Sequence, residues 1–405
     1  MLVESLVRRT LGVKDHRVVS ARDDLDWIVI RVERRRFRRL PCSICGTRSP
    51  VYDRLTERDW RHVPLWGVPT WINYAPARVQ CPTCGIRVEK IPWGPSKSPL
   101  SWPLVILLAT WARLLALEVV ASLFGVSWST VGSAMKQAVA HGLAHRDTST
   151  VVILGIDEIS RKKHHVYHTQ VYDLEGKRLL WSGEGRDTAT LKAFFEEWGK
   201  ERTARIIGIC CDMWAPLIKE AAPDAILVFD KFHIVRHLLD AVNDVRKDEA
   251  RRLRKDNPSL LAGSKYLWLA NPWNLSPKKQ QRLGFLMTLN GRIQRAYLLK
   301  EAFREFWNYR SRRGAASFLK KWFWWATHSR LEPLRNFAWM LRRHEDDILS
   351  YFDLPIDNGA VEAMNNNAKS VSHRAHGFRT AGWFSTVLLH TLGQLPMPVF
   401  THRFS

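Results

Sequence analysis

The chain has 405 residues, 46% of them hydrophobic, which allows two or three folded domains and excludes a disordered protein. Lys and Arg number 62 against 39 Asp and Glu, and the formal net charge of +23 indicates a polyanionic partner, of which nucleic acid fits best. The longest apolar stretch, 102–120, is interrupted by Arg113 and Glu118 and falls short of a membrane span. The first residues lack the apolar region of an export signal, so the sequence predicts a cytoplasmic protein.

A dense arginine cluster occupies residues 31–39, RVERRRFRR, after two segments that predict a short β-hairpin. Glu33 is the one acid inside the cluster, so phosphate contacts are favoured over a merely solvated face. We expect DNA contacts from Arg34, Arg35, Arg36, Arg38 and Arg39.

Two CxxC motifs, each followed by glycine, flank strand-like segments that could not form a sizeable core alone. Paired motifs of this kind supply the four thiolates of a tetrahedral zinc site, and disulfides are the weaker interpretation in a cytoplasmic protein. The sequence therefore predicts one structural Zn²⁺ ion bound by Cys42, Cys45, Cys81 and Cys84.

A Pro-rich linker at 92–101 is followed by helical patterns, and the spacing of Ala121, Gly125 and Val131 predicts a helix-turn-helix at about 117–141. Its second helix would begin near Ser127, whose hydroxyl can cap it. An ordinary helical hairpin is the alternative, but the basic composition favours DNA binding. The exposed contacts would come from Trp128, Ser129 and Lys136.

Three apolar segments each end at an aspartate, which is typical of buried strands with a carboxylate at the exit. The aspartates are Asp157, Asp212 and Asp230, and carboxyl ends of parallel strands gather ligand sites at one edge of a sheet. For Asp230 a simple helix-capping role weighs equally. Two strands at 165–172 and 177–182 and two later helices complete a mixed sheet in the order of the ribonuclease-H-like fold.

Residues from about 235 to 353 contain no convincing strand and predict an all-helical insertion, in which a tryptophan cluster at 322–325 is more typical of core than of base stacking. A last helix starts near Val361, where offsets of three, four and seven from Glu362 place Asn365, Asn366 and Lys369 on one polar face. With an apolar stripe on the opposite side, we expect this polar face to lie along DNA.

The chain resembles DDE transposases of bacterial insertion sequences, specifically the ISL-three family. The resemblance covers nearly the whole chain and rests on the CxxC pairs, the helix-turn-helix and five blocks. These blocks are GIDE at 155–158, DMW at 212–214, FDKFH at 229–233, NGAVE at 358–362 and RAHGFR at 374–379.

The resemblance implies that Asp157, Asp212 and Glu362 are the catalytic acids and hold two Mg²⁺ or Mn²⁺ ions for DNA cleavage and strand transfer. The partners would be the terminal inverted repeats of the element and target DNA, bound by a dimer in the bacterial cytoplasm, at the nucleoid. Further DNA contacts are expected from Asn365, Asn366, Lys369, Arg374 and Arg379.

The expected fold is α/β, with a zinc-binding module at 1–95, a helix-turn-helix domain at 96–148 and a ribonuclease-H-like catalytic domain at 149–405. Two other functions stay open from the sequence. One is a catalytically silent DNA-binding regulator derived from a transposase, which would have no reason to retain the acidic triad. The other is a ribonuclease-H-like nuclease without strand joining, which shares that triad.

Overall fold

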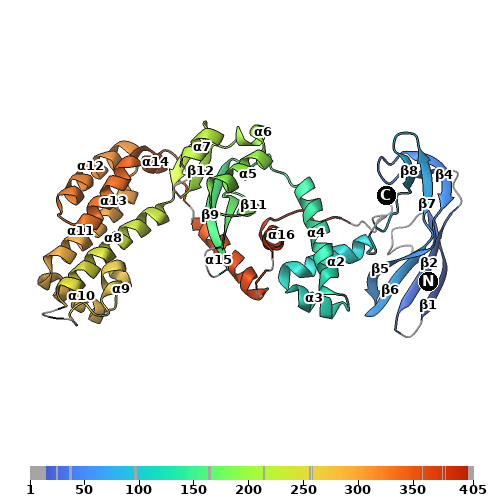
Figure 1. The fold of residues 1–405 in the computed structure, drawn as a ribbon, viewed down its shortest axis with the longest axis horizontal. Coiled ribbons are helices and arrows are strands. Elements are labelled where there is room, and N and C mark those ends of the chain that lie inside the picture. The colour runs from blue at the N-terminus through green and yellow to red at the C-terminus, as the bar shows by residue number, and fades with distance from the viewer. Residues whose placement is uncertain are drawn as a thin grey trace. The chain divides into compact units, whose positions relative to one another are not determined.

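The computed structural model describes residues 15–23, 26–35, 39–94, 98–162, 166–212, 215–254, 257, 259–357, 359–375, 377–378 and 380–399. Contacts divide the chain into two compact units (Figure 1). The first unit comprises residues 1–147 and 370–405, and the second comprises 148–369. The expected domain at 149–405 therefore does not match this division, because residues 370–405 group with the N-terminal part of the chain.

Strands dominate the first part of the first unit, where the described residues form two four-stranded sheets, ordered β1-β2-β6-β5 and β3-β4-β7-β8. The predicted hairpin is confirmed, because β1 and β2 pair antiparallel. Trp60, Ile72 and Trp93 are fully buried and belong to the hydrophobic cluster that packs on the first sheet. The strands are β1 His16–Asp23, β2 Ile28–Arg34, β3 Arg39–Pro41, β4 Arg48–Arg54, β5 Arg58–Leu65, β6 Val68–Tyr74, β7 Ala77–Cys81 and β8 Gly85–Val88.

Helices α2 Trp102–Leu114, α3 Leu117–Leu123 and α4 Trp128–His145 follow the sheets and share an apolar core. The Ser101 side chain accepts from the Leu104 N–H and caps α2, and the Ser127 side chain accepts from the Thr130 N–H and caps α4. Helices α3 and α4 are bent by 111°, and Gly125 in the turn has φ +55°. The predicted helix pair and its capping serine are thus confirmed.

Helix α16 Ala381–Leu392 packs on α4 and α2 of the same unit. The buried His390 ring bonds the Ala109 carbonyl at 2.7 Å, and Arg113 donates to the Leu395 carbonyl at 2.7 Å. The Lys136 ammonium lies 4.3 Å from the ring centroid of Trp383. These contacts explain why the C-terminal segment belongs to the first unit.

The second unit contains a five-stranded sheet ordered β11-β10-β9-β12-β13. β9 Ile153–Lys162, β10 Val166–Asp173 and β11 Arg178–Glu184 are antiparallel neighbours, whereas β12 Gly208–Cys211 and β13 Ile226–Phe229 run parallel to β9. The mixed sheet is as expected, with one difference. β9 continues to Lys162 because it pairs with β10 over that length, so Asp157 lies inside the strand and not at its exit.

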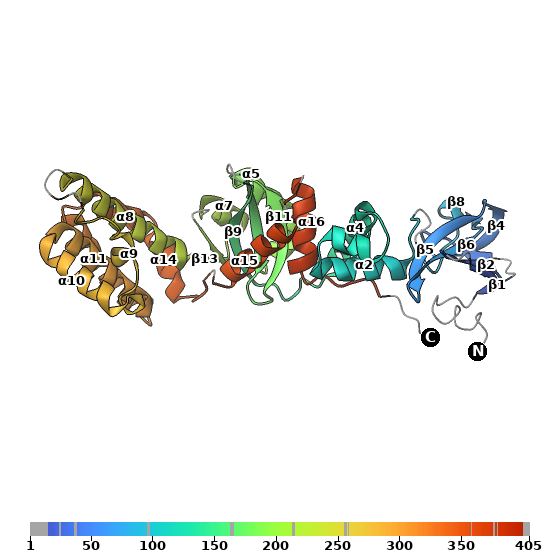
Figure 2. The ribbon, with the colours of Figure 1, turned by 90° about the horizontal axis from the view of Figure 1, so that it is seen from below.

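Alternation along β9 separates the two faces of this sheet. Leu154 and Ile156 are buried against α5 Thr188–Trp198 and α7 Ala215–Ala221, while Asp157 lies on the face that α15 Gly359–Arg374 covers (Figure 2). A short helix, α6 Lys200–Thr203, leads from α5 towards β12. One face of the sheet thus packs on α5 and α7, and the other carries Asp157 and faces α15.

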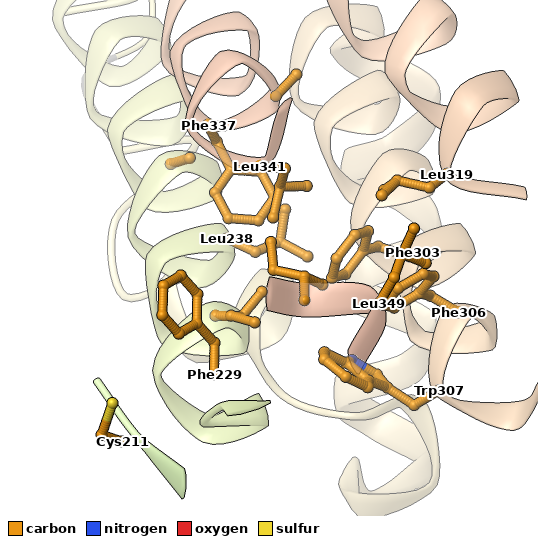
Figure 3. Packing of buried hydrophobic residues seen from close by; sticks show 14 of the residues in the cluster. Cys211, Phe229, Leu238, Phe303, Phe306, Trp307, Leu319, Phe337, Leu341 and Leu349 are labelled. Atoms are coloured by element: carbon orange, nitrogen blue, oxygen red, sulfur yellow. The ribbon is translucent and has the colours of Figure 1, made fainter. Parts of the chain in front are cut away.

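The described residues of the segment from 231 to 353 form helices joined by turns and contain no strand, as expected. Phe229, Leu238 and Leu349 join its core to that of the sheet (Figure 3), and Trp322 is buried and donates to the Leu299 carbonyl. The elements are α8 Lys231–Arg252, α9 Lys265–Leu269, η1 Pro272–Asn274, α10 Pro277–Leu289, α11 Gly291–Arg304, η2 Glu305–Asn308, α12 Arg312–His328, α13 Glu332–Arg343, α14 Glu345–Leu349 and η3 Ser350–Phe352.

Among the described residues, no single helix has the length and apolar character needed to cross a membrane. Only α3 and α4 taken together meet those criteria, and the bend between them is 111°.

Candidate active site and DNA-binding surfaces

Strand register places three aspartates side by side on the sheet of the second unit. β12 pairs with β9 up to Cys210 opposite Gly155, and with β13 up to Cys211 opposite Phe229. Continuing both registers to Asp212 sets it beside Asp157 on one side and Asp230 on the other. Burial raises the pKa of Asp157, and the nearby charges of Asp230 and Asp212 add to this rise.

Asp230 is committed to its own helix and to a histidine. One carboxylate oxygen accepts from the Phe232 N–H at 3.2 Å and caps α8, and the other lies 2.8 Å from Nδ1 of His233. This hydrogen bond, with the charge of Asp212 nearby, raises the pKa of His233 to about 9. The imidazolium Nε2 lies 3.9 Å from an Asp212 oxygen, so His233 stands between two of the acids. The capping role considered for Asp230 is confirmed.

Helix α15 brings its polar face to Asp157 through Asn365. The Asn365 amide donates to Oδ2 of Asp157 at 2.7 Å, and its oxygen accepts from the Tyr172 hydroxyl at 2.6 Å. Asn365 is 4% exposed, so its assignment to sugar or base edges of DNA is wrong: both ends of the amide are used inside the protein. Glu362 lies three residues earlier on the same helix and is exposed.

The acids suit divalent ions in chemistry, because hard carboxylate oxygens are the ligands that Mg²⁺ and Mn²⁺ prefer. Among the described residues, the four cysteines are the one set of three or more potential ligands whose donor atoms all lie within 4.8 Å of one another. Asp157, Asp212 and Glu362 do not form such a closely spaced set.

Cys42, Cys45, Cys81 and Cys84 are brought together as expected, where β3 and β7 lead into tight turns. The glycines that follow the two motifs, Gly46 and Gly85, both have φ +74°, a conformation that favours glycine. A tetrahedral Zn²⁺ with bonds of about 2.3 Å separates its sulfurs by roughly 3.8 Å, and the Sγ atoms of Cys45 and Cys81 are 3.4 Å apart. The geometry fits zinc.

Helix α4 exposes Trp128, Ser129 and Lys136, as predicted for a recognition helix. Trp128 is 53% exposed at the start of the helix, whereas the Lys136 ammonium is engaged by the ring of Trp383. Trp128 is therefore the more available of these side chains, since the Ser129 hydroxyl lies 2.8 Å from that of Ser127.

The arginine cluster is not a uniform phosphate surface. Arg34 is buried and pairs with the fully buried Glu89, so its assignment to DNA is wrong. The sequence could not show this partner, because it stands 55 positions away. Arg35 and Arg39 are exposed, and Arg36 and Arg38 lie outside the described residues.

A hollow of about 950 Å³ lies beside this cluster within the first unit. Its acids Glu33 and Glu57 are paired with Arg17 and Arg31 at 3.0 and 2.7 Å. Since further guanidiniums remain, the lining keeps a net positive charge. Its arginines are Arg17, Arg31, Arg34, Arg35 and Arg54.

The remaining expected DNA contacts differ in availability. Lys369 and Asn366 are exposed on α15. Arg374 donates to the backbone carbonyls of Leu114 and Arg113 at the end of α2, which corrects its assignment to phosphates. Arg379 lies outside the described residues.

Sequence reasoning missed His233, Tyr172 and the structural use of Asn365. His233 follows Asp230 by three residues and Asn365 follows Glu362 by three, so one helical turn links each to an acid. That spacing was the available signal for both. Tyr172 carried none, because it is one aromatic residue among others in β10.

A family model described as a transposase, for the ISL-three group of DDE enzymes, matches residues 154–388. The chain is similar to the transposase of insertion sequence element IS1557 from two strains of Mycobacterium tuberculosis, with 29% identity over 93% of this chain and 92% of the relative. It is also similar to the transposase of IS1001 from Bordetella parapertussis, with 29% identity over 85% of this chain and 86% of that protein. Because the family model matches more than half of the chain, the chain belongs to the ISL-three family of DDE transposases, DNA-acting enzymes of insertion sequences.

Proposed function

We propose that this transposase binds the terminal inverted repeats of its element and performs DNA cleavage and strand transfer at Asp157, Asp212 and Glu362. The observation that supports this most is that Asp157 on β9 lies against the helix that carries Glu362, while Asp212 directly follows β12, the parallel neighbour of β9. The mixed strand order is that of ribonuclease-H-like enzymes, in which such acids serve phosphodiester chemistry.

Two divalent ions, when bound, activate the attacking oxygen and stabilise the leaving oxygen. Asp157 would supply a carboxylate already fixed by hydrogen bonds to both of its oxygens. Asp212 and Glu362 would flank it, each serving one ion. Asp230 is less suited to bind an ion, because it is 3% exposed and the imidazolium of His233 already balances its charge. The imidazolium of His233 lies near both Asp212 and Asp230 and reduces the repulsion between their negative charges.

DNA would be held by both units. In the first, the support comes from the net positive hollow beside β1 and β2, the exposed start of α4 and the cluster of four cysteines, which would hold one structural Zn²⁺. In the second, exposed Lys369 on the helix of Glu362 suits a phosphate near the cleaved bond. A dimer would pair the two element ends, since both must be cut for one transposition.

The test uses labelled element ends with Mg²⁺ and the variants Asp157→Asn, Asp212→Asn and Glu362→Gln. Each should bind the ends and fail to cut them, because an amide lacks the negative charge that holds the cations. Asp224→Asn changes an exposed aspartate of the same unit and should cut normally. Full cleavage by any triad variant would remove that residue from the site.

Adding target DNA to the same reaction separates the remaining functions. Joined products support the transposase, whereas cleavage without joining would favour a nuclease. Binding without cleavage by the unaltered chain would favour a regulator.

A further inference from the structure

We propose that Asn365 is a positioning residue of the active site, which fixes the carboxylate of Asp157 and sets the helix of Glu362 against it. This inference rests on the proposed function, because it takes Asp157 and Glu362 as ligands of the ions. Asn365 itself would touch neither the ions nor DNA.

The amide of Asn365 has one orientation in its surroundings. Its oxygen accepts from the Tyr172 hydroxyl at 2.6 Å, so its NH₂ group faces Asp157 and donates to Oδ2 at 2.7 Å. Tyr172 is fully buried and Asn365 is almost so. The flipped amide is disfavoured because it would place its oxygen against the Asp157 carboxylate, which only accepts hydrogen bonds, and the Tyr172 hydroxyl supports the observed orientation by donating to the amide oxygen.

The second oxygen of Asp157 is fixed as well. Oδ1 accepts from the backbone N–H of Glu158 at 2.8 Å. With one donor on each oxygen, the carboxylate plane is set, and each oxygen retains a lone pair for a cation. In metal sites, such outer hydrogen bonds orient the ligands and contribute to metal affinity.

The same hydrogen bond determines where Glu362 stands. Residues three apart on a helix have Cβ atoms about 5–6 Å apart on one face. Asn365 meets Asp157 from 208 positions away in the sequence, so it holds the Glu362 face of α15 beside β9. One side chain thus orients one acid and sets the distance to another.

Packing alone does not explain an asparagine at this position. Val361, Met364 and Ala368 are buried on α15 and supply the apolar contacts of the helix. A buried amide is unfavourable unless its hydrogen bonds are made, so an apolar residue would serve a purely structural helix at least as well. What an apolar residue could not supply is the donor to Asp157.

The experiment measures Mn²⁺ binding by the full chain without DNA, from the electron paramagnetic resonance signal of the free ion. Mn²⁺ prefers oxygen ligands, so the cysteines contribute little. Asn365→Ala should weaken Mn²⁺ binding by about 10–100-fold. Tyr172→Phe keeps the ring but removes the donor that fixes the amide oxygen of Asn365, and should weaken binding by about 2–10-fold. Asn367→Ala, an exposed asparagine on the same helix, is the matched control and should bind like the unaltered chain.

Because the two hydrogen bonds act in series, the double variant Asn365→Ala with Tyr172→Phe should bind Mn²⁺ no more weakly than Asn365→Ala alone. Unchanged Mn²⁺ affinity in Asn365→Ala overturns the inference, as does additive loss in the double variant. If Asn365→Ala does not fold, unchanged affinity in Tyr172→Phe overturns it. Asp157→Asn separates a failure of the positioning role of Asn365 from a failure of the metal site. If Asp157→Asn also binds Mn²⁺ normally, the proposed metal site itself is refuted.

Discussion

Replacing Glu89 by glutamine should unfold the N-terminal β-module, which consists of strands β1 to β8. The substitution leaves the buried guanidinium of Arg34 without its main counter-charge. The Glu89 side chain is 0% exposed and accepts from the Tyr74 hydroxyl at 2.6 Å, from the Ala77 N–H at 2.8 Å and from Arg34. Glutamine keeps one oxygen for two of these donors. Its NH₂ group then faces Arg34, whose other acid, Asp15, lies 3.5 Å away and is half-exposed.

The magnitude follows from burial. Removing one partner of a buried ion pair costs about 3–5 kcal/mol, which is a large share of the stability of a small module. The pair of Arg17 and Glu33 on β1 and β2 is the matched control, since these side chains are 63% and 41% exposed. Glu33→Gln should cost about 0–1 kcal/mol.

Hydrogen–deuterium exchange followed by mass spectrometry resolves the module from the rest of the chain. Peptides covering β2 and β6 should exchange roughly a hundredfold faster or more in Glu89→Gln, as each 1.4 kcal/mol is about tenfold. The same variant should bind element ends more weakly. If Glu89→Gln exchanges no faster than Glu33→Gln, the burial argument is refuted.

Three further perturbations address other features. Purified protein should contain about one zinc per chain under reducing conditions, and Cys81→Ser should lose it; zinc-free native protein would exclude the site. Trp128→Ala should lower affinity for element ends by about tenfold while thermal unfolding stays unchanged, because Trp128 is half-exposed; an unaltered footprint would assign recognition elsewhere. Burial lowers the pKa of His390 to about 4, so the free energy of unfolding should fall by up to about 3 kcal/mol as the pH falls from 6.5 to 4. His390→Gln should flatten that pH dependence, measured by urea unfolding, and an identical profile would contradict it.

The sequence was sufficient for much of the fold because its strongest patterns were local. The helix-turn-helix followed from Ser127, Gly125 and small residues at helical spacing, and the CxxC motifs located the cysteine cluster. The sheet followed from apolar segments that end near aspartates. Strand length was not predictable in the same way, because β9 extends beyond Asp157 only through pairing with β10.

Errors occurred where a polar residue finds a distant partner. Arg34 belongs to a charged cluster, yet its environment is set by Glu89 on another part of the module. Asn365 has the helical position of a DNA contact, but Tyr172 and Asp157 make it internal. Periodicity locates the face of a helix, whereas the neighbour of that face depends on tertiary packing.

The return of α16 to the helices of the first unit affects synthesis of the protein. Arg113 and Leu395 are 282 positions apart, and the His390 ring reaches the Ala109 carbonyl across 281. During synthesis on the ribosome, α16 can therefore dock on the helix-turn-helix only after almost the whole chain has been made. A product that stops short of Ala381 would leave α2 and α4 uncovered where α16 belongs. Such incomplete products would compete poorly for element ends, which favours occupancy by chains that also carry the whole second unit, Glu362 included.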